Sequence, residues 1–273
     1  MGDNRVSDVG NGNGDFDPWP DTAVHVEWGV EAAMQGAQRG DVVVVVDVLS
    51  FSTTVCIALE QGASVLALSA AQIEAMGGRD VVAKRFDAHI VAKRRDDPKA
   101  KFTLSPASVG RVDAGDKLVL TSLNGAAMVA AGASGRPLLT GSLRSASATA
   151  QVAARQMAAQ SASRITIVAS AEHWSSVSPG VAGIRPSIED QIGAGAVSAG
   201  LGNLGLELSA EADAAAALFT ATSNRMEAML FDCVSGRELV AGGFGRDVEL
   251  AAQIDVTNIA SLQDPNGFFV STA

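Results

Sequence analysis

A run of five valines at residues 42–46 constrains this chain more than any other feature of its sequence. A β-branched residue at every position predicts a strand that is buried on both faces, as in the parallel sheet of an α/β protein. Asp47 ends the run, and the hydroxyl side chains of Ser52, Thr53 and Thr54 follow it. A carboxylate at the end of a buried strand is costly unless it is paired, hydrogen-bonded or bound to a cation. The segment therefore favours phosphate-ester chemistry, with Asp47 beside a metal ion and the hydroxyls and a helix N-terminus beside a phosphate.

Strand and helix signals alternate along most of the chain. Residues 1–22 are rich in Gly, Asn and Asp, which predicts a disordered leader, and residues 23–273 are predicted to form an α/β domain. We expect strands at residues 41–49, 64–68, 117–121, 137–140 and 164–168, strand-like fragments at 81–83 and 89–92, and helices at 53–61, at 70–76, from Gly125, from Ser145 to about residue 160, and from Ile188 onward. This order predicts a largely parallel sheet with helices on its faces, and a ligand site where the carboxyl ends of the strands meet.

Charge and hydropathy argue against two classes of partner. A formal charge of −10 is unfavourable for nucleic-acid binding, which needs a basic surface. No apolar run reaches the length of a membrane span and no secretory signal is visible, so we expect a cytoplasmic protein. The cysteines Cys56 and Cys233 are expected to be core thiols rather than a disulfide. The oligomeric state stays open, with a homodimer as the default for a soluble enzyme.

Acidic and imidazole side chains supply the candidates for catalysis and metal binding. Glu172 and His173 follow the last predicted strand, and His173 is the best placed of the three histidines for general acid or base catalysis. Glu189 and Asp190 open the last predicted helix, where either could bind Mg²⁺ together with Asp47. Each has a structural alternative, because Asp47 can cap the turn that follows it and the acidic pair can stabilise the helix N-terminus.

Polar loops after the strands hold the residues expected to bind an anionic substrate. Asn124 lies between a strand and a helix, and Arg144 carries a guanidinium fork that suits phosphate or sulfonate. The alternatives are an ordinary Asn-Gly turn, a surface arginine and a serine in a common proline turn. The set predicted to contact substrate comprises Ser52, Thr53, Thr54, Ser105, Asn124, Gly125, Ser142, Arg144 and Arg185.

Three glycines in the last predicted helix, Gly193, Gly195 and Gly200, superficially resemble a dinucleotide-binding loop. They follow no predicted strand, whereas the dinucleotide fingerprint needs a strand before its glycines. We therefore interpret them as the packing face of a helix.

Five segments, taken in their order along the chain, carry a family resemblance. They are residues 47–54 (DVLSFSTT), 104–108 (LSPAS), 121–125 (TSLNG), 141–146 (GSLRSA) and 187–190 (SIED). Together with a closing segment at residues 235–255, they resemble the 2-phosphosulfolactate phosphatase family over roughly residues 40–260. The resemblance implies a three-layer α/β/α fold with a largely parallel or mixed sheet. It also implies Mg²⁺-dependent hydrolysis of a small sulfonated, phosphorylated hydroxy acid, a reaction whose best-known setting is coenzyme M biosynthesis.

The chain departs from that family at several positions. Ser50 and Phe51 stand where the family usually carries Arg-Ala, and Ala-Ser-Ala at residues 169–171 replaces a common Cys-Ala-Gly. These departures motivate an alternative function, a non-catalytic protein that binds a small anionic metabolite on the same fold. Phosphomonoester hydrolysis with and without Mg²⁺ separates the two functions.

Overall fold

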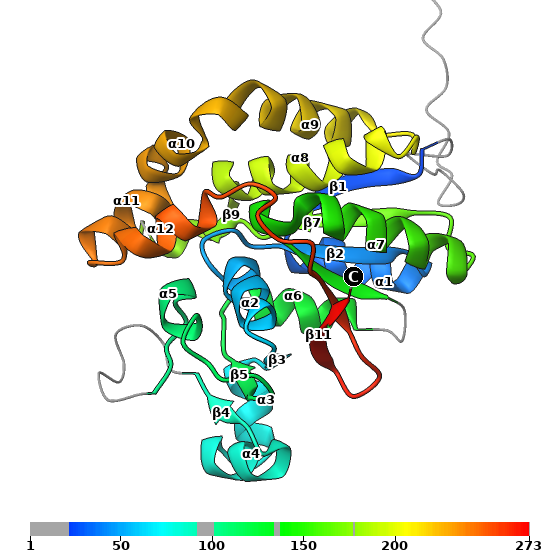
Figure 1. Ribbon diagram of the computed structural model, residues 1–273. Helices are drawn as coiled ribbons and strands as arrows, with labels where there is room; N and C mark the ends of the chain where they lie inside the picture. The colour runs from blue at the N-terminus through cyan, green and yellow to red at the C-terminus, as the bar shows by residue number, and fades with distance from the viewer. Residues whose placement is uncertain (1–21, 92–100, 134–136, 177, 273) are drawn as a thin grey trace, which may run out of the picture.

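A computed structural model describes residues 22–91, 101–133, 137–176 and 178–272 (Figure 1). The predicted leader lies outside the described residues except for Thr22. The strands are β1 (Val24–Trp28), β2 (Val42–Val46), β3 (Ser64–Ala67), β4 (His89–Ile90), β5 (Lys117–Leu120), β6 (Leu138–Gly141), β7 (Ile165–Ala169), β8 (Glu172–His173), β9 (Ile184–Arg185), β10 (Ala260–Gln263) and β11 (Phe268–Thr272). The α-helices are α1 (Gly29–Arg39), α2 (Phe51–Glu60), α3 (Ala70–Ala75), α4 (Arg79–Phe86), α5 (Pro106–Val109), α6 (Gly125–Gly132), α7 (Ala146–Ala159), α8 (Ile188–Asn203), α9 (Ala210–Thr222), α10 (Met226–Asp232), α11 (Val234–Ala241) and α12 (Gly245–Ala251).

A mixed sheet runs through the described part of the chain in the order β1-β7-β2-β6-β10-β11-β3-β5-β4. β1, β7, β2 and β6 are parallel neighbours, and so are β3, β5 and β4. The hairpin β10–β11 lies between these groups and pairs antiparallel with β6 on one side and with β3 on the other. Helices cover the sheet (Figure 1), which confirms the α/β class and the three-layer α/β/α arrangement.

The valine strand β2 lies in the middle of the larger parallel group and is buried on both faces, as predicted. Val42, Val44 and Val46 pack into the core formed with α7, α8 and α9. Val43 and Val45 pack into a second core, formed with α1, α2 and α6. Because successive side chains of a strand point to opposite faces, the unbroken valine run supplies apolar contacts to both helical layers.

The glycines of α8 form a packing face, which confirms that interpretation over a dinucleotide loop. A Cβ added to Gly193 would lie 2.5 Å from Val48 Cγ2 and 2.9 Å from Val46 Cγ1. A Cβ added to Gly195 would overlap the carbonyl of Ala215 in α9. The absence of side chains lets α8 approach both the valine strand and the neighbouring helix closely.

Two expectations from the sequence are wrong. Residues 81–83 belong to α4 rather than to a strand, and in this helix Val82 is buried while Val81 is 47% exposed. The polar loops of all the predicted strands also do not meet at a single edge of one parallel sheet. Three successive antiparallel pairings, β6–β10, β10–β11 and β11–β3, reverse the direction of β3, β5 and β4 relative to β2.

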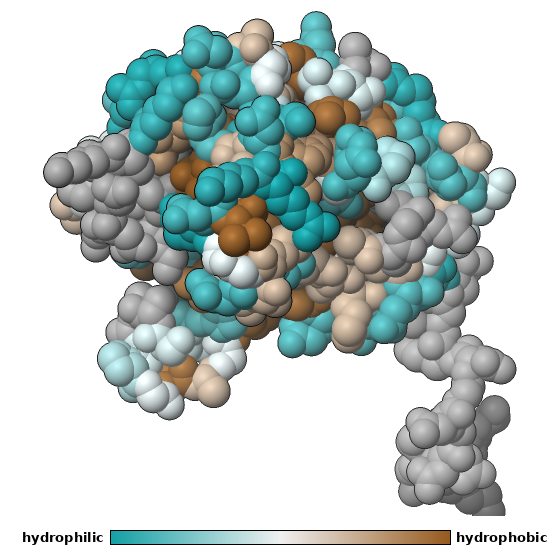
Figure 2. Space-filling view, turned by 90° about the horizontal axis from the view of Figure 1, so that it is seen from below, coloured by the Kyte–Doolittle hydropathy of each residue, from teal (hydrophilic) through white to brown (hydrophobic). Residues whose placement is uncertain are grey.

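The surface mixes polar and apolar residues. Seen from below, hydrophobic residues lie in small groups between hydrophilic ones (Figure 2). Of the helices that the structure describes, none is both long enough and apolar enough to cross a membrane.

Candidate active site

Asp47 directly follows β2 and is 8% exposed. Its Oδ1 accepts a hydrogen bond from the backbone N–H of Phe51 at 3.2 Å, so the side chain does cap the turn into α2. Its carbonyl oxygen accepts a hydrogen bond from Ser52 Oγ at 2.8 Å. These bonds fix the carboxyl group at the carboxyl end of the buried strand, which is compatible with a functional role as well as with the capping one.

Glu189 and Asp190 bring two more carboxyl groups to this end of β2. Both lie in the first turn of α8 and are almost fully buried. Asp190 Oδ1 accepts a hydrogen bond of 2.8 Å from the backbone N–H of Val48, the residue after Asp47. Burial, followed by the negative charges of Glu189 and Asp47, raises the pKa of Asp190 well above its ordinary value. The strand end and the helix start therefore form one acidic cluster.

Glu172 adds a fourth carboxyl group from the segment after β7. Its Oε2 accepts a hydrogen bond of 3.3 Å from Asn124 Nδ2, which also donates to the carbonyl of Ala171 at 3.2 Å. Burial raises the pKa of Glu172, the Asn124 hydrogen bond opposes this rise, and the charge of Glu189 adds to it. Asn124 thus reaches the cluster even though β5, which precedes it, runs against β2. We call Asp47, Glu172, Glu189 and Asp190 the carboxylate cluster.

The ribbon β8–β9 decides which side chains face this cluster. Its register sets Glu172 opposite Arg185 and His173 opposite Ile184. Because strand side chains alternate between faces, Glu172 and Arg185 share one face while His173 and Ile184 share the other. Glu172 and Arg185 are partly buried, whereas His173 and Ile184 are exposed. The structure therefore places His173 on the outward face, and of the two predicted acid–base residues only Glu172 faces the cluster.

Cys233 is a neighbour of the cluster that the sequence did not single out as functional. It precedes α11, and its thiol donates to the Leu230 carbonyl at 3.1 Å and accepts a bond from the Gly236 N–H at 3.2 Å. Burial and the nearby Glu189 charge raise the pKa of Cys233 to about 12. Cys233 and Cys56 are both buried free thiols, as predicted. No pattern in the sequence linked Cys233 to Glu189, 44 positions earlier.

The hydroxyls after β2, which the sequence predicted to contact substrate, donate to backbone carbonyls of the loop. Ser52, Thr53 and Thr54 are fully buried. Ser52 Oγ donates to the carbonyl of Asp47 at 2.8 Å, Thr53 Oγ1 to that of Val48 at 2.8 Å, and Thr54 Oγ1 to that of Ser50 at 2.7 Å. Their donor protons are used in holding the strand-to-helix turn.

Arg144 and Ser142, also predicted to contact substrate, make hydrogen bonds within the fold. Arg144 Nη2 lies 2.9 Å from Glu60 Oε2 at the far end of α2, and Arg144 donates to the Leu250 carbonyl and to Gln253 Oε1. Ser142 Oγ lies 3.1 Å from Ser145 Oγ in the buried turn before α7. The guanidinium fork predicted to bind phosphate is thus occupied by a partly buried carboxylate and two uncharged acceptors.

Ser105 and Gly125 have structural roles as well. Ser105 caps α5 and donates to Asp247 Oδ1 at 2.7 Å, which joins α5 to α12. Gly125, the first residue of α6, lies against Phe51, and a Cβ added to it would overlap the Phe51 ring. Of the nine residues predicted to contact substrate, Asn124 binds the Glu172 carboxyl group and Arg185 lies opposite Glu172, whereas Ser52 contacts the backbone of Asp47.

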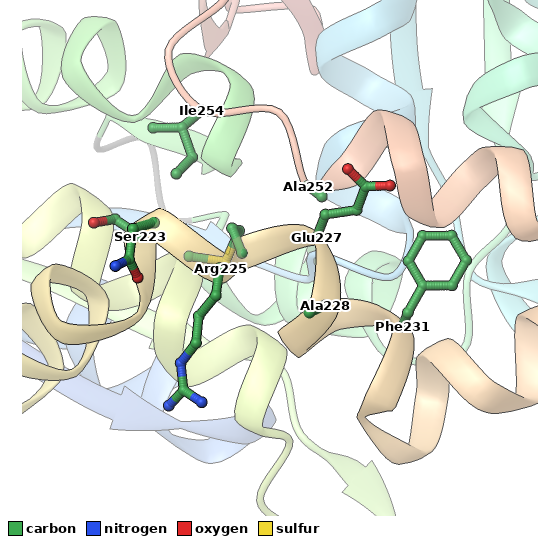
Figure 3. A pocket seen from close by; sticks show the side chains of 9 residues that line it. Ser223, Arg225, Glu227, Ala228, Phe231, Ala252 and Ile254 are labelled. Atoms are coloured by element: carbon green, nitrogen blue, oxygen red, sulfur yellow. The ribbon is translucent and has the colours of Figure 1, made fainter.

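An open pocket of about 630 Å³ lies elsewhere, between α10 and the segment that follows α12 (Figure 3). It is lined by Ser223, Asn224, Arg225, Met226, Glu227, Ala228, Phe231, Ala252 and Ile254. These residues include no member of the carboxylate cluster, and Figure 3 shows the Arg225 and Glu227 side chains pointing apart. The pocket is therefore separate from the candidate active site.

A protein-family model described as 2-phosphosulpholactate phosphatase matches residues 30–265 of this chain. The chain belongs to this family. The predicted resemblance is thus confirmed over nearly the whole sequence, and with it the class of enzyme, a phosphoric monoester hydrolase. Among curated proteins, none matches the chain.

The carboxylate cluster of this family member suits a hard cation in its chemistry, because it offers oxygen donors and excess negative charge. Among the residues that the structure describes, no three His, Cys, Asp or Glu side chains converge closely enough to enclose a metal ion. Mg²⁺ does not need such a cage, since it commonly takes one or two protein carboxylates and completes its shell with water and substrate oxygens. Burial and, after it, repulsion from Glu189 and Asp47 raise the pKa of Asp190, and a cation would offset the repulsion. The residues therefore fit Mg²⁺ with partial protein coordination.

Proposed function

We propose that this chain is a Mg²⁺-dependent phosphatase that hydrolyses 2-phosphosulfolactate or a related small phosphorylated hydroxy acid. The observation that carries the proposal is the carboxylate cluster, in which four carboxyl groups from three separate segments lie near enough for their charges to act on one another at the carboxyl end of β2. Parallel sheets bind ligands at this edge. Membership of the phosphatase family supports the same reaction class.

Asp47 and Asp190 are the residues that would hold Mg²⁺, which polarises a phosphoryl oxygen when it is bound. Each carboxyl group uses one oxygen to accept a backbone N–H, from Phe51 and Val48 respectively. These bonds orient both side chains before a substrate arrives, which is the preorganisation that an electrostatic site needs.

Glu172 is the proposed general acid. Asn124 binds its Oε2, which leaves Oε1 to carry a proton. Burial raises the pKa of Glu172 and so favours the protonated form that an acid needs. As a water oxygen bonds to phosphorus and the bond between phosphorus and the ester oxygen breaks, the proton moves from Oε1 to the ester oxygen, and the alcohol leaves with a neutral hydroxyl group. The phosphoryl group leaves as hydrogen phosphate, which keeps one proton of the water, and the other proton of the water restores the Glu172 carboxyl group. Asn124 acts as a positioning residue because it fixes the Glu172 carboxyl group.

Phosphate release from 2-phosphosulfolactate, measured with Mg²⁺ and with excess chelator, tests the proposal. Asp47→Asn and Asp190→Asn are informative variants, because an amide oxygen can still accept the backbone N–H while the charge is lost. Both are expected to fold and to lose at least about 100-fold in kcat/KM, as expected when an electrostatic contact to the transition state is removed. Asp213→Asn, an exposed position in α9, is the matched control.

Full activity of Asp47→Asn would show that Asp47 is not a ligand of the proposed Mg²⁺ ion. A wild-type protein that releases no phosphate, yet is stabilised thermally by phosphate or sulfolactate, would instead identify the non-catalytic binding protein.

A further inference from the structure

Two buried polar atoms beside the carboxylate cluster have no hydrogen-bond partner within the described part of the chain. They are Arg185 Nε and Ser187 Oγ. Ser187 is only 1% exposed, so bulk solvent does not reach its hydroxyl. Native proteins keep few such atoms, because a buried polar group without a partner destabilises the fold. Two of them on residues two positions apart, next to a candidate active site, indicate a ligand that supplies the missing partners.

Ser187 is the residue where a helix-capping bond is expected and is not made. It occupies the N-cap of α8, a helix of 16 residues, and its backbone carbonyl accepts the Gln191 N–H at 3.1 Å. A capping serine normally accepts a backbone N–H of the first turn through its hydroxyl. Ser187 makes no such side-chain bond. Ser105 and Ser209, the N-caps of α5 and α9, both do. The Ser187 hydroxyl therefore does not cap α8, although a serine at this position usually does.

Arg185 is the cation that the ribbon β8–β9 presents beside the cluster. It lies opposite Glu172, and its charge acts on that carboxyl group. Arg144, the other arginine predicted to hold an anion, is occupied by Glu60. An anion bound by Arg185 would sit close to Glu172 and Glu189, which repel it. A ligand at this position is therefore favoured when it belongs to the same molecule as a phosphate held through a cation at Asp47 and Asp190.

Resting on the proposed phosphatase function, we propose that Arg185 and Ser187 form a subsite for a second anionic group of the substrate, a carboxylate or sulfonate on the phosphorylated carbon skeleton. Arg185 Nε–H and the Ser187 hydroxyl donate to its oxygens, and the positive end of the α8 dipole adds to the attraction. The two residues set specificity, because a phosphomonoester without the second anion leaves both donors unpaired. A site built to hydrogen-bond a group discriminates strongly against substrates that lack it.

The test compares two substrates, 2-phosphosulfolactate and phenyl phosphate, which has no second anionic group. The readout is the ratio of their kcat/KM values in the wild type, in Arg185→Gln and in Ser187→Ala, with the exposed Arg79→Gln in α4 as the matched control. We expect the ratio to fall about 10- to 100-fold in Arg185→Gln and about 5- to 10-fold in Ser187→Ala, the scale of lost hydrogen bonds to a charged group. The control should keep the wild-type ratio.

Thermal unfolding without ligand separates the proposal from a structural role. Because the Ser187 hydroxyl makes no bond in the fold, Ser187→Ala should leave the melting temperature unchanged or raise it, whereas loss of a working cap would lower it. A lowered melting temperature with an unchanged ratio would overturn the subsite. The subsite would also be overturned if Arg185→Gln and Ser187→Ala were both active and both kept the wild-type ratio of kcat/KM values.

Failure of the phosphatase proposal has a different signature. If the wild type hydrolyses neither substrate, calorimetric titration with sulfolactate decides the subsite on its own. Binding by the wild type that is lost in Arg185→Gln would support the subsite, and equal or absent binding in both proteins would overturn it.

Discussion

Gly125→Ala is the substitution whose effect follows most directly from the structure. The added Cβ would overlap the Phe51 ring and lie 2.8 Å from the Phe51 Cβ. Carbon atoms prefer separations of about 3.5–4.0 Å, so the ring has to move by about 1 Å. Phe51 is 1% exposed and packs in the core formed with α1, α2 and α6, which leaves it little space. Gly125 does not have a positive φ, so the penalty is steric rather than a backbone effect.

We expect Gly125→Ala to lower the free energy of unfolding by about 1–3 kcal/mol, the usual cost of overpacking a core. The better helix propensity of alanine, worth at most about 1 kcal/mol, offsets only part of this cost. Urea denaturation followed by circular dichroism measures the change. Because Asn124 adjoins the strained position, its hydrogen bond to Glu172 should also loosen, and kcat should fall.

A double-mutant cycle with Phe51→Ala tests the reasoning. Phe51→Ala alone should cost about 3–5 kcal/mol, because it removes a large buried side chain. In that background the contacts with the ring are gone and only the 2.8 Å contact with the Cβ of residue 51 remains, so the penalty for Gly125→Ala should be much smaller. An equal penalty for Gly125→Ala with and without the Phe51 ring, which is a coupling energy near zero, would refute the steric explanation.

Three further predictions concern the buried charges and thiols. Arg144→Met removes the ion-pair partner of Glu60, whose side chain is 16% exposed. Urea denaturation should show a loss of about 3–5 kcal/mol in the free energy of unfolding, and adding Glu60→Leu should recover most of it. A double variant as unstable as Arg144→Met alone would contradict this prediction. Burial lowers the pKa of His25 from its ordinary value of 6.5. Below pH 6.5 the unfolded chain therefore binds a proton at His25 more readily than the folded chain does, so the free energy of unfolding should decrease as the pH falls. His25→Gln should flatten the stability profile between about pH 7 and pH 5, and an unchanged profile would count against His25. Burial raises the pKa of both Cys56 and Cys233, so a disulfide reagent at neutral pH should modify them only after unfolding, and fast reaction of the native protein would show this to be wrong.

The features that sequence reasoning found are those with a local cause. The valine run predicts its own burial, because β-branched residues without polar interruption have to be covered on both sides. The glycines of α8 predict a packing face by their spacing alone. The ordered segments predict the family, since each is a short contiguous motif. Val81 and Val82 show the limit of this approach, because a short apolar stretch fits a strand or a helix equally well.

The features that it missed depend on contacts between distant parts of the chain. Arg144 was a reasonable anion ligand until Glu60, 84 positions earlier, was placed against it. The ordering of Asp190 by Val48 spans 142 positions, and neither residue hints at the other. The hairpin β10–β11 had a readable signal, because Asp264 Oδ1 accepts the N–H groups of Asn266 and Phe268 in an Asp-Pro-Asn-Gly turn. The sequence carries no comparable signal for the position of this hairpin between β6 and β3.

That insertion has a consequence for how the protein is made. Strands β10 and β11 follow every other strand of the sheet in the chain, yet they join its two parallel groups. Until they leave the ribosome, β6 and β3 each present an unpaired edge to other chains, and synthesis at about 5–20 residues per second keeps those edges open for several seconds. The nascent protein is thus most prone to aggregation while α8 to α12 are being translated. The risk ends when β10 and β11 pair with the edges of β6 and β3.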